Sequence, residues 1–351
     1  MKRLLINLLT YLFMLFAITF FSCEDKEIKV SSSGSKLVVG GIFFADSVMQ
    51  VTLTRNLPLD SNRVNVDIAV ENAEVIVYAE DELVDRLEFV VPTPEELENV
   101  FWFSPGHSRY RSTTNFSAQE GIEYKIVINA EGYQETVAST LIPKSVPIHD
   151  VQYSWKTEVV DIDFDPWGGS HTFNGAPFSI TFQDSPDTEN YYKIQCLSKI
   201  DFDYTSYFYN GDSMRYVGSN LSTTGIRAKI SRGENVTEEN PYTFQDKIIF
   251  SDEFFNGELH TLDFYMQFHE ESLRPGLTIF DEENRKGYHD YTLFVVLQHI
   301  TRAQYLYEVT LDEQALIFGD TFSEPVFVHS NVENGLGIFA GYSMSKVVIT
   351  E

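Results

Sequence analysis

The sequence predicts a mainly β protein built from two antiparallel, sandwich-like domains. Short segments of alternating apolar and polar residues, rich in β-branched and aromatic types, recur at 48–54, 73–78, 124–128, 178–182, 262–268 and 291–297. Clusters of Pro, Gly, Asn, Asp and Ser separate them, as at 57–62, 104–106 and 184–187. Because hardly any helical segment intervenes, packed antiparallel sheets are favoured over a parallel sheet with crossover helices.

The chain is longer than one hydrophobic core usually serves, so we expect two domains. Pro143 and Pro147 suggest a boundary near Lys144, because proline cannot donate a ladder hydrogen bond within a central strand. We therefore expect an N-terminal β-sandwich domain at residues 36–143 and a C-terminal β-rich domain at residues 144–351.

Only one long helix is expected, at residues 301–317 in the second domain. Apolar or aromatic side chains recur there at helical spacing, at Ala303, Tyr307, Leu311 and Ala315. Residues at this spacing form one stripe along a helix. The pattern therefore predicts an amphipathic helix that packs its apolar stripe against the second domain.

The N-terminus has the pattern of a lipoprotein signal peptide. Lys2 and Arg3 precede an apolar run that ends at Ser22 and Cys23. Residues 20–23 resemble the lipobox of bacterial lipoproteins, so we expect a signal peptide at residues 1–22, lipid attachment at Cys23 and a flexible tether at residues 23–35. A secreted protein without lipid is one alternative. An uncleaved membrane anchor is another, because the run of about 18 residues approaches the roughly 20 that span a bilayer.

Charge and cysteine content exclude several functions. The formal net charge is −27 and no basic stripe is visible, so nucleic acid is excluded as a partner. Anionic lipid would also repel the chain, so contact with the membrane must come through the lipid anchor at Cys23. Once Cys23 is lipidated, Cys196 has no partner for a disulfide, and we expect a buried, inert thiol.

Three segments carry a family resemblance: residues 121–128 with 138–143, residues 250–257, and residues 322–339. The first resembles the end of an immunoglobulin-like or carboxypeptidase-regulatory-like sandwich. Together they resemble the Bacteroidetes lipoprotein family called domain of unknown function 4249, over nearly the whole mature chain. The third segment is the most specific.

The resemblance implies an accessory role in nutrient uptake, since members of that family are usually encoded beside TonB-dependent outer-membrane receptors. It implies a non-enzymatic lipoprotein of the outer membrane that binds a ligand or partner for such a receptor. The acidic stretch after Cys23 resembles the signal that sends lipoproteins to the cell surface, with the periplasmic side as the alternative. The family supplies no catalytic or binding residues to carry over.

The residues of the third segment also have a purely structural interpretation. Asn334 and Gly335 suit a tight turn, and Gly337 permits close approach of another backbone. Residues 338–349 then return as a final strand.

Enzyme signatures are absent from the sequence. It has no Gly-x-Ser-x-Gly elbow, no His-Glu-x-x-His pair, no phosphate-binding loop and no dinucleotide fingerprint. We therefore expect no enzymatic activity and no cofactor. Two alternatives stay open: a surface structural or adhesive subunit, and a hydrolase that acts on a glycan or peptide.

Three acidic residues form a weak candidate for a metal site. Asp161, Asp163 and Asp165 would share one face of a strand, and calcium prefers such oxygen ligands. Pro166 replaces the glycine that an EF-hand loop needs, and a solvated acidic edge is the alternative.

The candidate binding site is the aromatic segment at residues 201–212. In one short strand it would place Phe202, Tyr204 and Phe208 on one face and Tyr207 and Tyr209 on the other. Exposed tyrosines suit protein or sugar contact, since the ring offers apolar area and the hydroxyl a hydrogen bond. The proposed binding residues are Tyr204, Tyr207, Tyr209 and Asp212. The alternative is a central strand buried on both sides.

Overall fold

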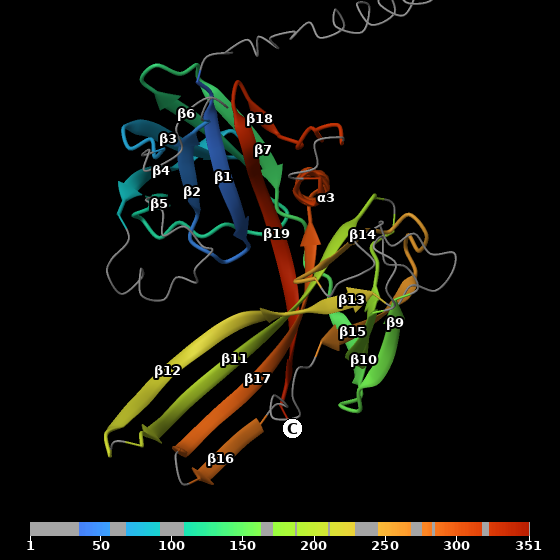
Figure 1. Cartoon of the computed structure of the whole chain (residues 1–351). Coiled ribbons are helices and arrows are strands. Elements are labelled where there is room, and N and C mark those ends of the chain that lie inside the picture. The colour runs from blue at the N-terminus through green and yellow to red at the C-terminus, as the bar shows by residue number, and fades with distance from the viewer. Residues whose placement is uncertain are drawn as a thin grey trace, which may run out of the picture.

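The computed structural model describes residues 35–56, 68–91, 109–162, 171–186, 188–209, 211–228, 245–267, 276–282, 285–317 and 323–350. Within these residues the protein is mainly β, as predicted, and its strands form two sheets that are mostly antiparallel (Figure 1). The strands follow the alternation seen in the sequence. In β6 (Glu123–Ala130), for example, Tyr124, Ile126 and Ile128 are buried on one face while the residues between them are not.

The larger sheet has 14 strands, in the order β12-β11-β17-β19-β1-β2-β5-β4-β3-β6-β7-β18, with β14 paired to β11 and β16 to β17. Besides β6, its strands are β1 (Leu37–Phe44), β2 (Gln50–Arg55), β3 (Ala73–Ala79), β4 (Glu82–Val90), β5 (Arg109–Ser112), β7 (Thr136–Leu141), β11 (Tyr191–Tyr207), β12 (Ser213–Thr224), β14 (Ile248–Ser251), β16 (Gly276–Glu282), β17 (Arg285–Ile300), β18 (Val332–Glu333) and β19 (Leu336–Ile349).

The smaller sheet has five strands and covers one face of the larger sheet. Its central order is β13-β15-β10-β8, and β9 also pairs with β10. The strands are β8 (Ile148–Tyr153), β9 (Glu158–Ile162), β10 (His171–Gln183), β13 (Ile226–Ala228) and β15 (Leu259–Gln267).

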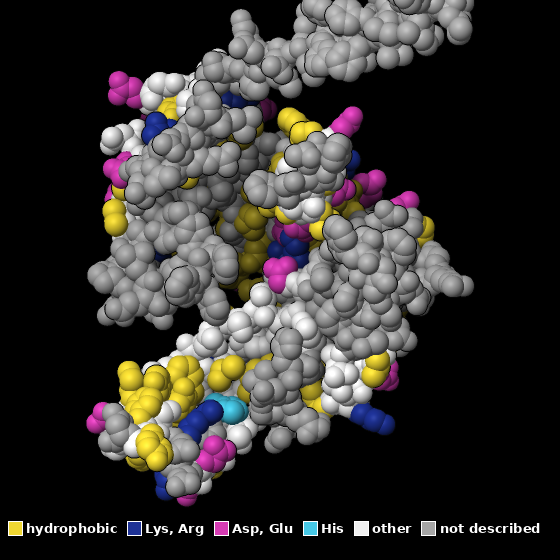
Figure 2. All heavy atoms as spheres, in the orientation of Figure 1, with side chains coloured by type: hydrophobic (Ala, Val, Ile, Leu, Met, Phe, Trp, Pro, Cys, Tyr) yellow, Lys and Arg dark blue, Asp and Glu magenta, His cyan; other side chains and the backbone are white. Residues whose placement is uncertain are grey.

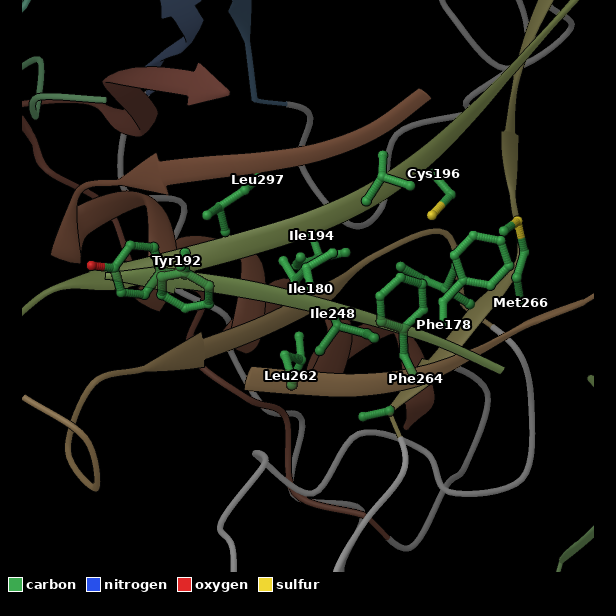
Figure 3. Packing of buried hydrophobic residues seen from close by; sticks show 14 of the residues in the cluster. Phe178, Ile180, Tyr192, Ile194, Cys196, Ile248, Leu262, Phe264, Met266 and Leu297 are labelled. Atoms are coloured by element: carbon green, nitrogen blue, oxygen red, sulfur yellow. The ribbon is translucent and has the colours of Figure 1, made fainter. Parts of the chain in front are cut away.

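The buried apolar residues form two separate cores. The core of the second domain lies between the two sheets, where Phe178, Ile180 and Phe264 of the smaller sheet meet Tyr192 and Ile194 of the larger one (Figure 3). Cys196 lies in this core as a free, fully buried thiol, so the expectation that it is buried is confirmed, and burial raises its pKa. The core of the first domain is formed within the larger sheet, where β1–β7 bend around a common apolar interior.

The chain end joins the two domains. The predicted boundary near residue 144 falls between the cores, since Ile142 belongs to the first and Val146 to the second. However, Val332 and Phe339, from the end of the chain, also pack into the first core. The strand β19 then continues into the second domain and pairs with β17. One sheet therefore runs through both domains.

Gly337 makes the parallel pairing of β19 with β1 possible. It lies opposite Val39 with a φ of 97°, and a Cβ atom there would be 2.1 Å from the Val39 carbonyl oxygen. Asn334 has a φ of 58° in the turn between β18 and β19. The predicted tight turn, close backbone approach and final strand are therefore confirmed.

The helix α3 (Arg302–Leu316) confirms the predicted helix, and its N-cap is Thr301, whose hydroxyl accepts a hydrogen bond from the Gln304 backbone at 3.2 Å. The prediction of a buried apolar stripe is wrong. The buried residues of α3 are Gln304 and Glu308, whereas Leu311 is exposed.

The polar face of α3 is buried because two lysines meet it. The side chain of Glu308 is only 8% exposed and lies 3.0 Å from Lys193 of β11 and 3.1 Å from Lys247, just before β14. The Gln304 amide donates a further hydrogen bond to Glu308 at 2.8 Å. Burial alone would raise the pKa of Glu308, but the two lysines outweigh it and hold the pKa below its ordinary value. An ion cluster thus attaches α3 to the sheet.

Candidate functional site

Four strands extend beyond the smaller sheet as an arm, here defined as residues 199–209, 211–221, 276–282 and 285–290. The strand order is β12-β11-β17-β16, and the arm is visible at the lower left of Figure 1. The burial pattern marks where it begins: alternate residues of β11 are buried as far as Ser198, and none is buried from Lys199 onward. The smaller sheet no longer covers β11 beyond this point, so the rest of the strand is open to solvent.

One face of the arm carries a small aromatic cluster around Tyr204. The Tyr204 ring is stacked on Tyr216 of β12, with ring centroids 5.0 Å apart, and contacts Phe202 at 5.9 Å. The guanidinium of Arg285 lies 4.7 Å from the centre of the Tyr204 ring. Tyr204 is therefore half-buried and fixed by its neighbours within the arm.

A glycine makes room for this cluster. Gly287 of β17 lies directly opposite Tyr204 and has a φ of +150°. A Cβ atom on Gly287 would lie 2.4 Å from the Tyr204 Cα atom. This close approach requires glycine.

The opposite face of the arm presents a row of residues across all four strands. The ladder places Val217, Asp203, Tyr288 and Ile279 side by side, from β12 to β16. Val217 is 65% exposed and Ile279 is 73% exposed. Further exposed apolar residues on the same face are Leu221, Leu277 and Tyr207. Single exposed apolar residues are ordinary, but a contiguous group marks an interaction surface.

Ion pairs on this face hold the strands in register. Arg215 donates two hydrogen bonds to the Asp203 carboxylate, at 2.8 and 2.6 Å, which lowers the pKa of Asp203. Lys286 of β17 bonds Asp281 of β16 at 2.8 Å, while Lys199 bonds Asp201 within β11 at 2.6 Å. Arg215 and Lys286 thus join neighbouring strands of this face, and the apolar side chains between these pairs are available for contact.

The tip of the arm is a turn with three aromatic residues. Tyr207 is the last residue of β11, and Phe208 and Tyr209 follow it in the turn. The backbone of Phe208 donates to the Asp212 carbonyl oxygen at 2.8 Å, which closes the turn. All three aromatic side chains are exposed, Tyr209 completely. Figure 2 shows hydrophobic side chains gathered over the arm.

The sequence places these residues only in part. The interpretation as one short strand reaching Tyr209 is wrong, because β11 has 17 residues and ends at Tyr207. Phe202 and Tyr204 do share a face, and Tyr207 lies on the other. Sequence reasoning missed β12 and β16, whose apolar residues complete the surface. The apolar residues between Met214 and Leu221 could have indicated β12, but only once β11 is known as the strand that pairs with it.

Other predicted sites are less developed. Asp161 lies in β9, whereas Asp163, Asp165 and Cys23 lie outside the described residues. Within the described ranges, no three His, Cys, Asp or Glu side chains come together in a way that could hold a metal ion. The part of the chain that the structure describes also contains no helix that is both long and apolar enough to span a membrane.

Comparison with known proteins assigns the chain to a family. No curated protein matches it. The model of one family, described as "Domain of unknown function (DUF4249)", matches residues 24–347. This match covers the arm, α3 and, apart from Ile349, both cores. The chain therefore belongs to the DUF4249 family.

Proposed function

We propose that this protein is a non-enzymatic outer-membrane lipoprotein, anchored through Cys23, that uses the arm to bind a TonB-dependent receptor as an accessory in nutrient uptake. The observation that carries the proposal is the exposed apolar row on the arm, with Val217, Tyr288 and Ile279 in register across its strands. The choice of a TonB-dependent receptor as the partner rests on the family resemblance.

The energy of burial supports a protein partner. Covering a Val, Ile or Leu side chain completely contributes roughly 1.5–3 kcal/mol, so a few residues of this row supply much of the free energy of a specific complex. Aromatic residues such as Tyr207 and Tyr209 are common among the residues that dominate binding at protein interfaces. The long open edge of β12 also offers backbone groups to a partner strand.

The position of the arm is consistent with lipid anchoring. The first described strand, β1, starts at the top of Figure 1, and the arm lies at the bottom. Extended fully, a tether of about 12 residues after Cys23 reaches at most ~43 Å. Because the tether is attached at the end of the protein opposite the arm, the arm stays free to contact a neighbouring protein in the same membrane.

Site-specific photo-crosslinking tests this proposal. A benzoylphenylalanine residue replaces Val217 or Ile279 on the arm, or Leu83 as a control, in the full-length protein in its native host. Leu83 is also exposed, but it lies in β4 of the first domain. We expect both arm positions to crosslink to a TonB-dependent receptor and the control position not to do so. Crosslinks only to lipid, or equal crosslinks from Leu83, contradict the proposal.

A further inference from the structure

A pocket lies at the junction of the two domains, away from the arm. It has a volume of about 610 Å³, within the range of about 300–1,000 Å³ that is usual for small-molecule sites. Its walls come from the end of β7, the segment between the domains, the loop between β10 and β11, the end of β17 and the start of α3. Leu141 and Pro143 supply apolar lining.

His299 is the buried polar group of this pocket. Its side chain is 9% exposed, and its Nδ1 atom lies 2.8 Å from the Lys144 carbonyl oxygen. Because a carbonyl oxygen only accepts, Nδ1 carries the proton. Burial lowers the pKa of His299, so the ring is neutral near pH 7 and Nε2 is an acceptor. Among the described residues, no group donates to Nε2.

Two of the three charged side chains that line the pocket are basic, although the protein as a whole is acidic. Lys144 and Arg302 are the basic residues that line it, and Glu189 is the carboxylate among its described lining residues. The chain as a whole has a formal net charge of −27. Glu189 also accepts a hydrogen bond from the Tyr191 hydroxyl at 2.9 Å. Asp184, Asp252 and Glu120 act electrostatically on His299 but do not line the pocket, so the favourable place for an anion is the end of the wall formed by Lys144 and Arg302.

The start of α3 adds backbone donors at the same place. Thr301, Arg302 and Ala303 line the pocket, and the first turn of α3 contains no acidic side chain. Thr301 caps the N–H groups of Gln304 and Tyr305, which lie further along the helix. The earlier N–H groups precede the first intrahelical hydrogen bond, and such groups favour carboxylates.

We propose that this pocket binds a small carboxylate that also carries a hydroxyl or amino group. The carboxylate lies against Arg302, Lys144 and the start of α3. The hydroxyl or amino group donates to Nε2 of His299, and an apolar body lies against Leu141 and Pro143. Hydroxy acids and amino acids have this combination of groups.

Three related compounds test the proposal on the full-length lipoprotein in detergent. The probe is 2-hydroxyisocaproate, which has a carboxylate, a hydroxyl and an apolar body. Isocaproate lacks the hydroxyl, and 2-hydroxyisocaproamide lacks the charge. We expect the probe to bind in calorimetry and to shift the His299 Nε2 resonance in ¹⁵N spectra, with at least about tenfold weaker binding of each analogue.

Two surface variants localise the binding without touching the core. Arg302→Gln and Lys144→Gln should each weaken the probe several-fold and leave the melting temperature unchanged, because both side chains are exposed. Lys346→Gln, on the exposed end of β19, is the matched control and should have no effect. The proposal is overturned if none of the compounds binds at 10 mM, roughly the millimolar limit of useful affinity, or if binding is unaffected by both pocket variants.

Discussion

Gly287 of β17 lies so close to Tyr204 of β11 that a Cβ atom at position 287 would be 2.4 Å from the Tyr204 Cα atom. The aromatic cluster of the arm depends on this approach, because Tyr204 then stacks on Tyr216 and lies beneath Arg285. The arm lacks a covering sheet, so contacts of this kind, together with ladder hydrogen bonds and ion pairs, must maintain its shape.

Replacing Gly287 with alanine should therefore loosen the arm selectively. The added methyl group meets backbone atoms, and the φ of +150° is itself unfavourable for alanine, at a cost of order 1–3 kcal/mol. We expect faster amide exchange in β16 and in the arm half of β17, with little change in the core. Gly132→Ala is the control, since its φ of +85° carries backbone strain but nothing lies within 4 Å of its Cβ position. Equal exchange behaviour of the two variants would show that steric contact at Gly287 is unimportant.

The double substitution of Tyr207 and Tyr209 with alanine should leave stability nearly unchanged and weaken receptor binding. Both rings are exposed, and surface substitutions usually stay within about ±0.5 kcal/mol each. Loss of two aromatic anchors should cost binding about 2 kcal/mol or more. Thermal melts and co-purification with the receptor measure the two effects. Tyr110→Ala, in the first core, should by contrast cost ~3–5 kcal/mol. A collapse in stability of the double variant would refute a surface binding role.

Glu308→Gln should destabilise the fold by about 3–5 kcal/mol, because it leaves two lysines with 13% exposed side chains beside a neutral group. Asp312→Asn should lower the free energy of unfolding by only about 0–1 kcal/mol. Asp312 is half exposed, and of the two lysines it contacts only Lys247. Urea unfolding measures both differences.

The same measurement has a defined pH dependence. The pKa of Glu308 is lower in the folded protein than its ordinary value of 4.5, so its ionised form stabilises the fold above that value. This contribution is lost as the pH falls from about 4.5 through the lower folded pKa. The difference between wild type and Glu308→Gln should therefore shrink only in that acidic range. A difference that is constant down to pH 3 would contradict the role of the ion cluster.

Replacing Cys23 with alanine should release the protein from membranes. The prediction follows from the signal pattern that ends at Ser22 and Cys23, and from a net charge that disfavours adsorption to anionic lipid. Fractionation followed by a carbonate wash measures it. A variant that stays in the washed membranes would show that lipid at Cys23 is not the anchor.

Protease added to intact cells should remove the protein if the acidic stretch 24–27 directs it to the cell surface. A periplasmic protein of the same strain serves as the control for membrane integrity. Degradation only after the outer membrane is opened would place the protein on the periplasmic side.

Local sequence patterns were sufficient for several features. The alternation of buried and exposed residues in β6 and the start of α3 at Thr301 are set by neighbours within a few positions. The tight turn at Asn334 and the close approach at Gly337 also follow from residue type alone, because few other residues adopt these backbone angles.

The arm illustrates a feature that sequence indicates only in outline. The aromatic residues at 202–209 are visible in the sequence, and so is their suitability for contact. Whether they face solvent depends on where the smaller sheet ends, and that sheet is built from β8, β9, β10, β13 and β15, which come from distant parts of the chain. The same aromatic alternation would be a buried strand if the smaller sheet extended further.

By itself, the sequence determined the fold class, the helix that begins after Thr301, the burial of Cys196 and the family. Only the tertiary structure decided that β19 joins both domains, that α3 buries Glu308 rather than its apolar residues, and that His299 lines a pocket between domains. The physical reason is the same in each case. Each feature depends on a partner from a remote segment: Val39 for Gly337, Lys193 and Lys247 for Glu308, and Lys144 for His299. A buried charge or hydrogen-bonding group, such as Glu308 or His299, is stable only when its partner is in place.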